Sequence, residues 1–214
     1  MFGYPLGRAP GRELGLGVGA SWGRHHGTSA APGLTSLRSY GGQTFFAYRS
    51  DPTSVSPIVA DGELIRVVPH ATIAAGPLGV QLDGVLAWED VANTRVAMRA
   101  TSAIATVALT GEPARPLAFV VPRHPLHGPD PGPGAILVVA GFGGVRIDDA
   151  AFTAAADPAV AASRFTVLGG GVKWYPVAGI AAFVDYGHQW FGAARGAITR
   201  DTEDTLVARL QFIL

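Results

Sequence analysis

The chain has 214 residues, of which 48% are hydrophobic and 15% charged, and it contains 29 glycines and 16 prolines. Basic and acidic residues cancel to a formal charge of zero, which gives no support for nucleic acid as a partner, and the absence of cysteine excludes disulfides and cysteine metal sites. The glycine and proline content argues against a helical protein, and every apolar run is far shorter than the ~20 residues of a membrane helix. The remaining classes are a glycine-rich all-β domain and a β-barrel in lipid.

The N-terminal region predicts one long strand followed by a connection. Residues 1–14 lack a basic segment followed by an apolar core, so we expect no signal peptide in this chain. Residues 24–42 are polar and rich in Gly and Pro, which predicts a connection, 43–49 predicts a short aromatic strand, and 51–57 predicts a loop. In the first strand, bulky residues alternate with Gly and Ser, and the bulky face carries Leu14, Leu16, Val18, Ala20 and Trp22.

The clearest hairpin of the first half spans 63–90 and reverses at GPLG, residues 76–79. Its first strand places apolar residues outward and polar ones inward: Ile65, Val67, Ala71 and Ile73 against Arg66, His70 and Thr72. Its second strand repeats the pattern, with Val80, Leu82, Leu86 and Trp88 on one face and Gln81, Asp83 and Glu89 on the other.

The middle of the chain alternates predicted strands with connections. Residues 94–110 predict a strand whose orientation stays open, because Ala and Thr fill both faces. The proline-rich stretch 111–134 cannot be a central strand, yet it is too long for a turn on its side of the sheet, so a hidden strand there is one expectation. Residues 134–147 predict a strand, and the Ala-rich loop 148–163 has room for a short helical turn.

The C-terminal part holds the most regular elements. A hairpin is expected at 171–191 with a tight turn at 176–179, and 192–204 predicts the last loop. In the final strand the residues Leu206, Ala208, Leu210 and Phe212 face one way, while Arg209 and Gln211 face the other.

Strands of about ten residues with one apolar face, bounded by aromatic residues, are typical of a transmembrane β-barrel. The sequence therefore predicts an all-β, antiparallel meander of about nine consecutive strands within a range of eight to ten, and hence a partial transmembrane barrel. The residues expected at the membrane interface are Trp22, Trp88, Trp174, Tyr175, Tyr186 and Trp190. The residues expected to line a pore are Arg66, His70, Gln81, Asp83, Glu89, Arg209 and Gln211, with Lys173 as a further inward charge.

Motifs that carry chemistry elsewhere are better explained here without it. Residues 19–23, GASWG, match the G-x-S-x-G pattern of a nucleophilic serine, but that pattern needs a helix after Ser21, and 24–42 does not supply one. The histidines at 25–26 and 124–127 have no carboxylate at ligand spacing. The glycine-rich stretches 141–144 and 169–171 precede no helix, so they predict bending of a curved sheet rather than a phosphate cradle. We expect no enzyme activity, no metal and no cofactor.

Six segments in order resemble the C-terminal half of the phosphate-selective porin O/P family. The resemblance implies a bacterial outer-membrane barrel of about sixteen strands that sits in lipid, passes small anions and phosphate, and assembles as a homotrimer. The whole of 1–214 would then be the C-terminal part of such a barrel, with the N-terminal half and the signal peptide lying outside it. The chain departs from the family at Leu137 and Gly141–Phe142, where members carry a Glu and an Arg-Tyr pair. The segments are LGLGVGASWG (14–23), ADGELIRVVPH with GPLGVQLDGVLAWEDV (60–91), LTGE (109–112), GPGA (132–135), GVKWYP (171–176) and TEDTLVARLQF (202–212).

Two functional classes stay open at this point. A passive porin for small hydrophilic solutes predicts a polar, water-lined face along the full strand length. The alternative is a β-barrel ligand-binding protein or an outer-membrane hydrolase with Ser21 as nucleophile. That alternative predicts a closed pocket in which Ser21, a histidine and an aspartate come together.

Overall fold

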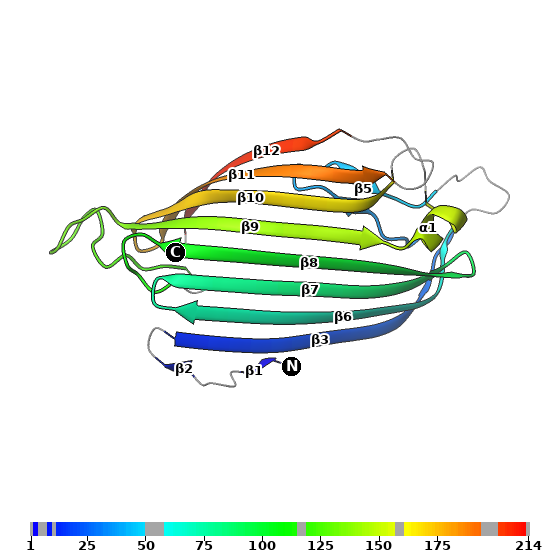
Figure 1. Ribbon diagram of the computed structural model, residues 1–214, viewed down its shortest axis with the longest axis horizontal. Helices are drawn as coiled ribbons and strands as arrows, with labels where there is room; N and C mark the ends of the chain where they lie inside the picture. Colours follow the sequence, from blue (N-terminus) through cyan, green and yellow to red (C-terminus); the bar gives the residue numbers. More distant parts are fainter. Residues whose placement is uncertain are drawn as a thin grey trace.

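A computed structural model describes residues 2–3, 8–9, 12–49, 58–114, 119–156, 161–193 and 201–212. Eight long strands form one antiparallel sheet in which each strand pairs with the next along the chain (Figure 1). The strands are β3 (Arg12–His26), β6 (Ala60–Ala75), β7 (Leu78–Val91), β8 (Thr94–Ala108), β9 (Ala135–Ile147), β10 (Ala162–Val177), β11 (Ile180–Ala193) and β12 (Glu203–Phe212). Two short strands, β1 (Phe2–Gly3) and β2 (Arg8–Ala9), pair with the outer edge of β3.

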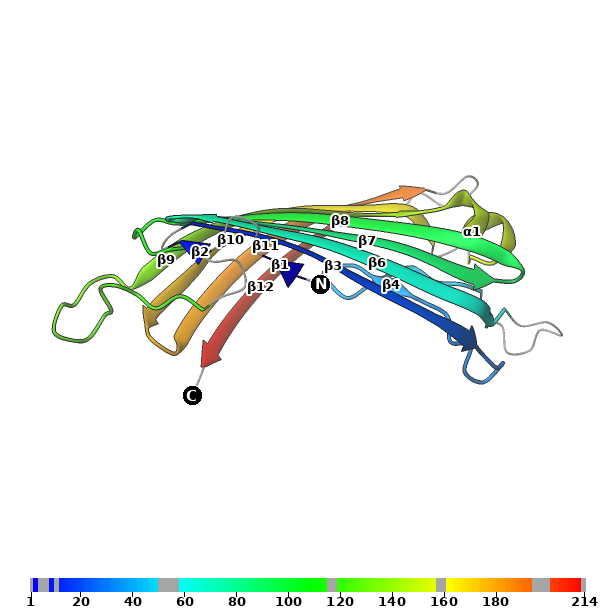
Figure 2. The ribbon, with the colours of Figure 1, turned by 90° about the horizontal axis from the view of Figure 1, so that it is seen from below.

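The sheet is strongly curved and not closed, because β3 and β12 lie at opposite edges and do not pair (Figure 2). The expectation of an all-β antiparallel meander is confirmed, with eight long strands where about nine were expected. One helix, α1 (Asp149–Ala154), occurs within the described ranges, in the connection predicted to hold a helical turn. None of the helices in the described part of the chain is long and apolar enough to cross a membrane.

Three of the connections are two-residue turns. Gly76 and Pro77 join β6 to β7, and Ala178 and Gly179 join β10 to β11. The turn between β7 and β8 places Ala92 and Asn93 in the left-handed region, with φ of 50° and 61°. Two consecutive left-handed residues give a hairpin turn whose twist matches that of the flanking strands.

The two faces of the sheet differ in kind. Alternate residues of each strand point to the convex face, and many of these are large apolar side chains left exposed. The opposite, concave face carries the polar partners of the alternation and is partly covered by connecting segments (Figure 2). The exposed convex residues include Leu16, Val18, Trp22, Leu82, Val107, Val138, Phe142, Leu168, Val172, Trp174, Val184, Trp190, Leu206, Leu210 and Phe212.

The short aromatic strand predicted within 43–49 is present, but it lies outside the meander. Its strand β5 (Thr44–Phe46) pairs only with β4 (Leu37–Arg38), and the two form a separate hairpin. Phe45 and Phe46 are 1% and 0% exposed, because both sides of the segment are packed. We call the core that they join the helix-end cluster: Phe45, Phe46, Tyr48, Val91, Val96, Ile147, Ala151, Ala155, Ala156, Ala161, Ala162, Phe165 and Phe191.

The long connection between β8 and β9 covers the concave face at the opposite end of the sheet. Its residues in 109–114 and 119–134 form no strand, so no hidden strand is found in those ranges. Phe119 stacks edge-on against Tyr175, with ring centroids 4.8 Å apart. We call this second core the loop-end cluster: Ala108, Ala114, Val120, Ala135, Leu137, Tyr175 and Ala181, with Phe119 and Phe183 packed against it.

Glu112 holds this connection in place. Thr110 donates a hydrogen bond to its carboxylate, and the backbone N–H of Arg123 donates a second one at 3.1 Å. Burial alone would raise the pKa of Glu112, but these hydrogen bonds outweigh it and leave the pKa below its ordinary value. The carboxylate therefore fixes both ends of residues 112–123 in its ionised form.

Candidate functional site

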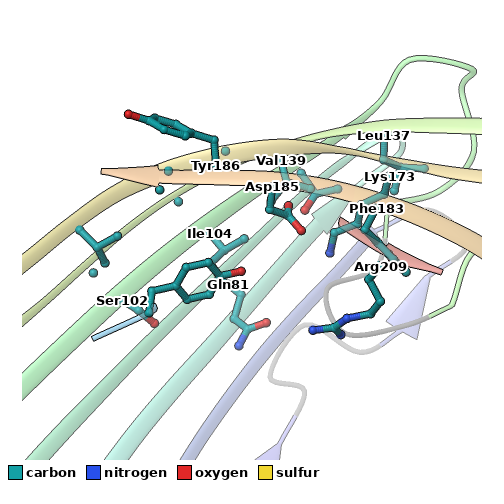
Figure 3. Close-up of a pocket in the computed structure, with 18 of the residues that line it drawn as sticks. Gln81, Ser102, Ile104, Leu137, Val139, Lys173, Phe183, Asp185, Tyr186 and Arg209 are labelled. Atoms are coloured by element: carbon teal, nitrogen blue, oxygen red, sulfur yellow. The ribbon is translucent and has the colours of Figure 1, made fainter. Parts of the chain in front are cut away.

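A cavity of about 660 Å³ lies on the concave face between the helix-end and loop-end clusters. Its walls come from β7 to β12 (Figure 3). Tyr40 and Phe119 line it from the two covering segments. The space is flanked by apolar cores on both sides, so the concave face is not polar along its full length, as a simple open pore would require.

Glycines make the floor of this cavity. Gly169 on β10 is paired with Gly141 on β9 and with Gly187 on β11, which leaves a row of three strands without side chains on the concave face. Gly143 and Gly170 line the same space. The missing side chains create the volume of the cavity, which larger residues at these positions would fill.

Charged side chains enter the cavity from three adjacent strands. Lys173 on β10 and Arg209 on β12 are both paired with Phe183 on β11, so the ring lies between two cations. The Lys173 Nζ lies 5.4 Å from the Phe183 ring centroid. Asp185 enters two residues further along β11. Among the described residues neither Lys173 nor Arg209 forms an ion pair, so the cavity holds two uncompensated cations and one carboxylate.

A polar cluster lies at the β6–β8 side of the cavity. The Asp83 carboxylate is 2.5 Å from His70 Nδ1, and it accepts hydrogen bonds from Gln81 Nε2 at 2.7 Å and Ser102 Oγ at 3.4 Å. Gln81 and Ser102 themselves line the cavity. The cluster extends the polar wall across three strands and ties their side chains together.

The residues predicted to line a pore all lie on the concave face, but at different depths. Gln81, Arg209 and Gln211 line the cavity, and the His70–Asp83 pair adjoins it. Arg66 is exposed on the same face, outside the cavity. Glu89 is 3% exposed and accepts a hydrogen bond from Tyr48 at 3.3 Å, so it is buried beneath the folded-in segment and does not line the cavity.

Burial and the neighbouring carboxylate raise the pKa of the Tyr48 hydroxyl, which keeps it protonated and able to donate to Glu89. The pair therefore fastens the β4–β5 segment to β7. The same segment is fastened to β11 and β12, where the Tyr40 N–H donates to Gln189 at 2.7 Å and Ser39 donates to Glu203 at 3.1 Å.

Five of the six aromatic residues expected at a membrane interface belong to the convex face: Trp22, Trp88, Trp174, Tyr186 and Trp190. Tyr186 touches the cavity region, but its ring points away from it (Figure 3). Tyr175 is 5% exposed within the loop-end cluster, on the concave face. Adjacent residues of a strand point to opposite faces, so Trp174 and Tyr175 cannot both be interface anchors.

Sequence analysis missed Asp185, Ser102 and Phe183 as cavity residues. Asp185 and Phe183 share a face of the strand 180–193. The sequence of that strand is most distinctive at its apolar turn and its terminal aromatic residues, which give no indication of a cavity. Ser102 lies in the strand whose orientation was left open, and pairing now shows that Ser102, Ile104 and Thr106 face the cavity.

Ser21 lies on β3 opposite Arg66 and, within the described residues, it makes no hydrogen bond to a histidine or a carboxylate. The structure therefore does not bring Ser21 together with a base. Within the same described ranges, no three His, Asp or Glu side chains gather to hold a metal ion.

No protein-family model and no curated protein matches this sequence.

Proposed function

We propose that this chain is part of an outer-membrane porin, with its convex face in lipid and its concave face lining a path for small anions and other small hydrophilic solutes. The observation that carries the proposal is the distribution of apolar and charged residues over the curved sheet. A soluble barrel packs apolar residues inside and polar residues outside. This sheet has the reverse arrangement, with exposed Leu, Val, Phe and Trp on its convex side and Arg66, Lys173, Asp185 and Arg209 on its concave side.

The apolar band has the dimensions of a membrane layer. On β3 it runs from Leu14 to Trp22, which corresponds to about 26 Å along the strand at ~3.3 Å per residue. Outer-membrane barrels have an apolar band roughly 25 Å tall.

A polar rim bounds this band at the end of the sheet where α1 lies. There Arg95 pairs with Glu63 at 3.0 Å and with Asp90 at 2.9 Å, and the Trp22 Nε1 donates to Glu63 at 3.3 Å. Further along the rim, His188 lies 2.6 Å from Asp204, and the Trp190 ring packs edge-on against His188 with centroids 4.4 Å apart. Such tryptophans, which contact the apolar band on one side and the polar rim on the other, suit the level of lipid headgroups.

The open edges set a requirement for this proposal. The outer edge of β12 and the part of the β3 edge that β1 and β2 leave unpaired cannot face hydrocarbon, so further strands must pair with both edges in the membrane. The family resemblance supports about sixteen strands per barrel and a trimer of barrels as the complete assembly.

For the path itself we propose a weak preference for anions. Arg66 and Arg209 lower the barrier for an anion near a low-dielectric wall, while Asp83 and Asp185 on the same face oppose them. The chain's formal charge of zero adds no overall bias.

The test is the reversal potential of the complete barrel that contains this chain, in a planar bilayer under a salt gradient. We expect weak anion preference, reduced in Arg66→Ala and in Arg209→Ala, and unchanged in Arg146→Ala, which removes an equal charge from the convex face. A cation-preferring pore, or a reversal potential that neither concave substitution moves, would refute the proposed path.

A ligand-binding role for the cavity is the second candidate function. It is favoured by the apolar clusters that close the concave face on both sides of the cavity.

A further inference from the structure

We infer that the concave cavity binds an amphipathic monocarboxylate, with the carboxylate between Lys173 and Arg209 and the hydrocarbon body against the loop-end cluster. This inference rests on the proposed function, because it makes the cavity a selective binding site along the path of the solutes. The cavity, its charges and its apolar walls are independent observations that point to the same ligand class.

The two cations are placed to converge on one anionic group. Lys173 and Arg209 are separated by one strand, which puts their backbones about 10 Å apart at ~4.8 Å per strand spacing. Both side chains are long and line the cavity, and the Lys173 ammonium group lies over the Phe183 ring. Two such side chains span that gap from opposite sides, and a carboxylate between them gains charge-assisted hydrogen bonds from both.

The net charge of the cavity selects a monoanion. Lys173 and Arg209 contribute two positive charges and Asp185 one negative charge, and the remaining lining residues are neutral. Adding a Cβ at Gly171 would bring it against the Asp185 side chain, so this carboxylate lies over Gly171, next to the Lys173 side of the site. A monoanion brings the net charge of the site to zero, whereas a dianion would leave a net negative charge beside Asp185.

The apolar walls of the cavity favour a ligand with an apolar body. Leu137, Val139, Ile104, Phe119 and Tyr175 line the cavity beside the cations. An inorganic anion would leave these surfaces in contact with water, whereas an aryl or alkyl chain would cover them and remove their apolar area from water. The aromatic rings of Phe119, Tyr175 and Phe183 form one edge-to-face group, which favours an aromatic body.

The test compares three probes on the unmodified chain, folded in a non-ionic detergent, by isothermal titration calorimetry. They are 4-phenylbutyrate, 4-phenylbutan-1-ol, which keeps the body without the charge, and inorganic phosphate, which is an anion without the apolar body. We expect saturable binding of one 4-phenylbutyrate per chain, with the alcohol and phosphate at least tenfold weaker. Equal or tighter binding of phosphate or of the alcohol would overturn the inference.

Variants locate the site. Lys173→Met and Arg209→Gln should each weaken 4-phenylbutyrate binding about tenfold, as expected for one charged hydrogen bond. Gly141→Val should weaken it as well, because it fills the floor without changing charge. Arg66→Gln is the matched control on the same face outside the cavity and should leave binding unchanged. An equal loss in Arg66→Gln would show a general charge effect and would refute the site.

Conductance of the complete barrel that contains this chain separates this inference from the proposed function. A barrel that conducts but shows no saturable 4-phenylbutyrate binding refutes the inference alone. A complete protein that binds 4-phenylbutyrate in the expected order but forms no pore refutes the porin and leaves the binding site standing.

Discussion

Two glycines in the same row of the cavity floor are expected to respond differently to the same substitution. A Cβ at Gly169 would lie 2.6 Å from the carbonyl oxygen of Tyr186, a backbone atom of the paired strand. A Cβ at Gly141 would have no neighbour closer than 3.6 Å, which is ordinary van der Waals contact. Only the first substitution forces two strands apart.

The size of the difference follows from these contacts. Overpacking that moves backbone costs about 1–3 kcal/mol, and replacing a strand glycine by alanine returns about 0.5–1 kcal/mol. We therefore expect Gly169→Ala to lower the free energy of unfolding by about 1–2 kcal/mol. Gly141→Ala should leave it unchanged or raise it by about 0.5 kcal/mol. A gap of about 2 kcal/mol is roughly a 30-fold difference in the folding equilibrium constant.

The assay is urea unfolding of the protein in detergent micelles, followed by tryptophan fluorescence, to which Trp174 on β10 and Trp190 on β11 contribute. Gly187→Ala is a second control, since its Cβ would meet only side-chain atoms at 3.6 and 3.7 Å. If the three variants lose equal stability, or if Gly141→Ala is the worst, the close approach of β10 and β11 is not what requires glycine at position 169.

Three further outcomes follow from contacts elsewhere. Tyr48→Phe removes the hydroxyl donor to buried Glu89 and should lower the free energy of unfolding in urea by about 1.5–3 kcal/mol. In a Glu89→Gln background the same substitution should lower it much less, and equal losses in both backgrounds would contradict the pair. Ala92→Gly relieves a left-handed φ and should raise the unfolding free energy by about 1 kcal/mol, so a lower urea midpoint would count against the turn geometry. Folding lowers the pKa of Glu112, so the stabilisation that the Glu112 carboxylate provides is present above the ordinary pKa of 4.5 and is lost as pH falls through the pKa of the folded state. The NMR resonance of the Arg123 amide should shift with this titration, and in Glu112→Gln the shift should be absent.

The strand phases of the hairpin 63–90 and of the last strand were predictable from sequence, because nearly all of their polar residues fall on one face opposite a row of bulky apolar residues, although Val68, Val85 and Val207 lie on the polar face. Leu82 faces the convex side and Gln81 the cavity, as the alternation requires. The phase of β8 was not predictable, since small Ala and Thr residues satisfy either face. Only pairing with β7 and β9 decides it.

The covering segments were missed for a different reason. Phe45 and Phe46 are consecutive and both buried, which no strand with one solvated or lipid face allows. That pair was the available signal that 43–49 packs between layers. The cavity was also out of reach, because it depends on glycines of three strands falling in one row, and such a row is a property of register rather than of any single segment.

The uneven lengths of the connections predict the order in which the strands pair during folding. The β6–β7–β8 unit and the β10–β11 hairpin are joined by two-residue turns, so their pairing closes the smallest loops in the chain. Pairing β3 with β6 requires closure of the connection from His26 to Ala60, which costs roughly 2 kcal/mol more in chain entropy before any contact forms. The β6–β7–β8 unit and the β10–β11 hairpin should thus act as two independent folding nuclei. Strand β3 should pair later, with the edge that β6 already presents.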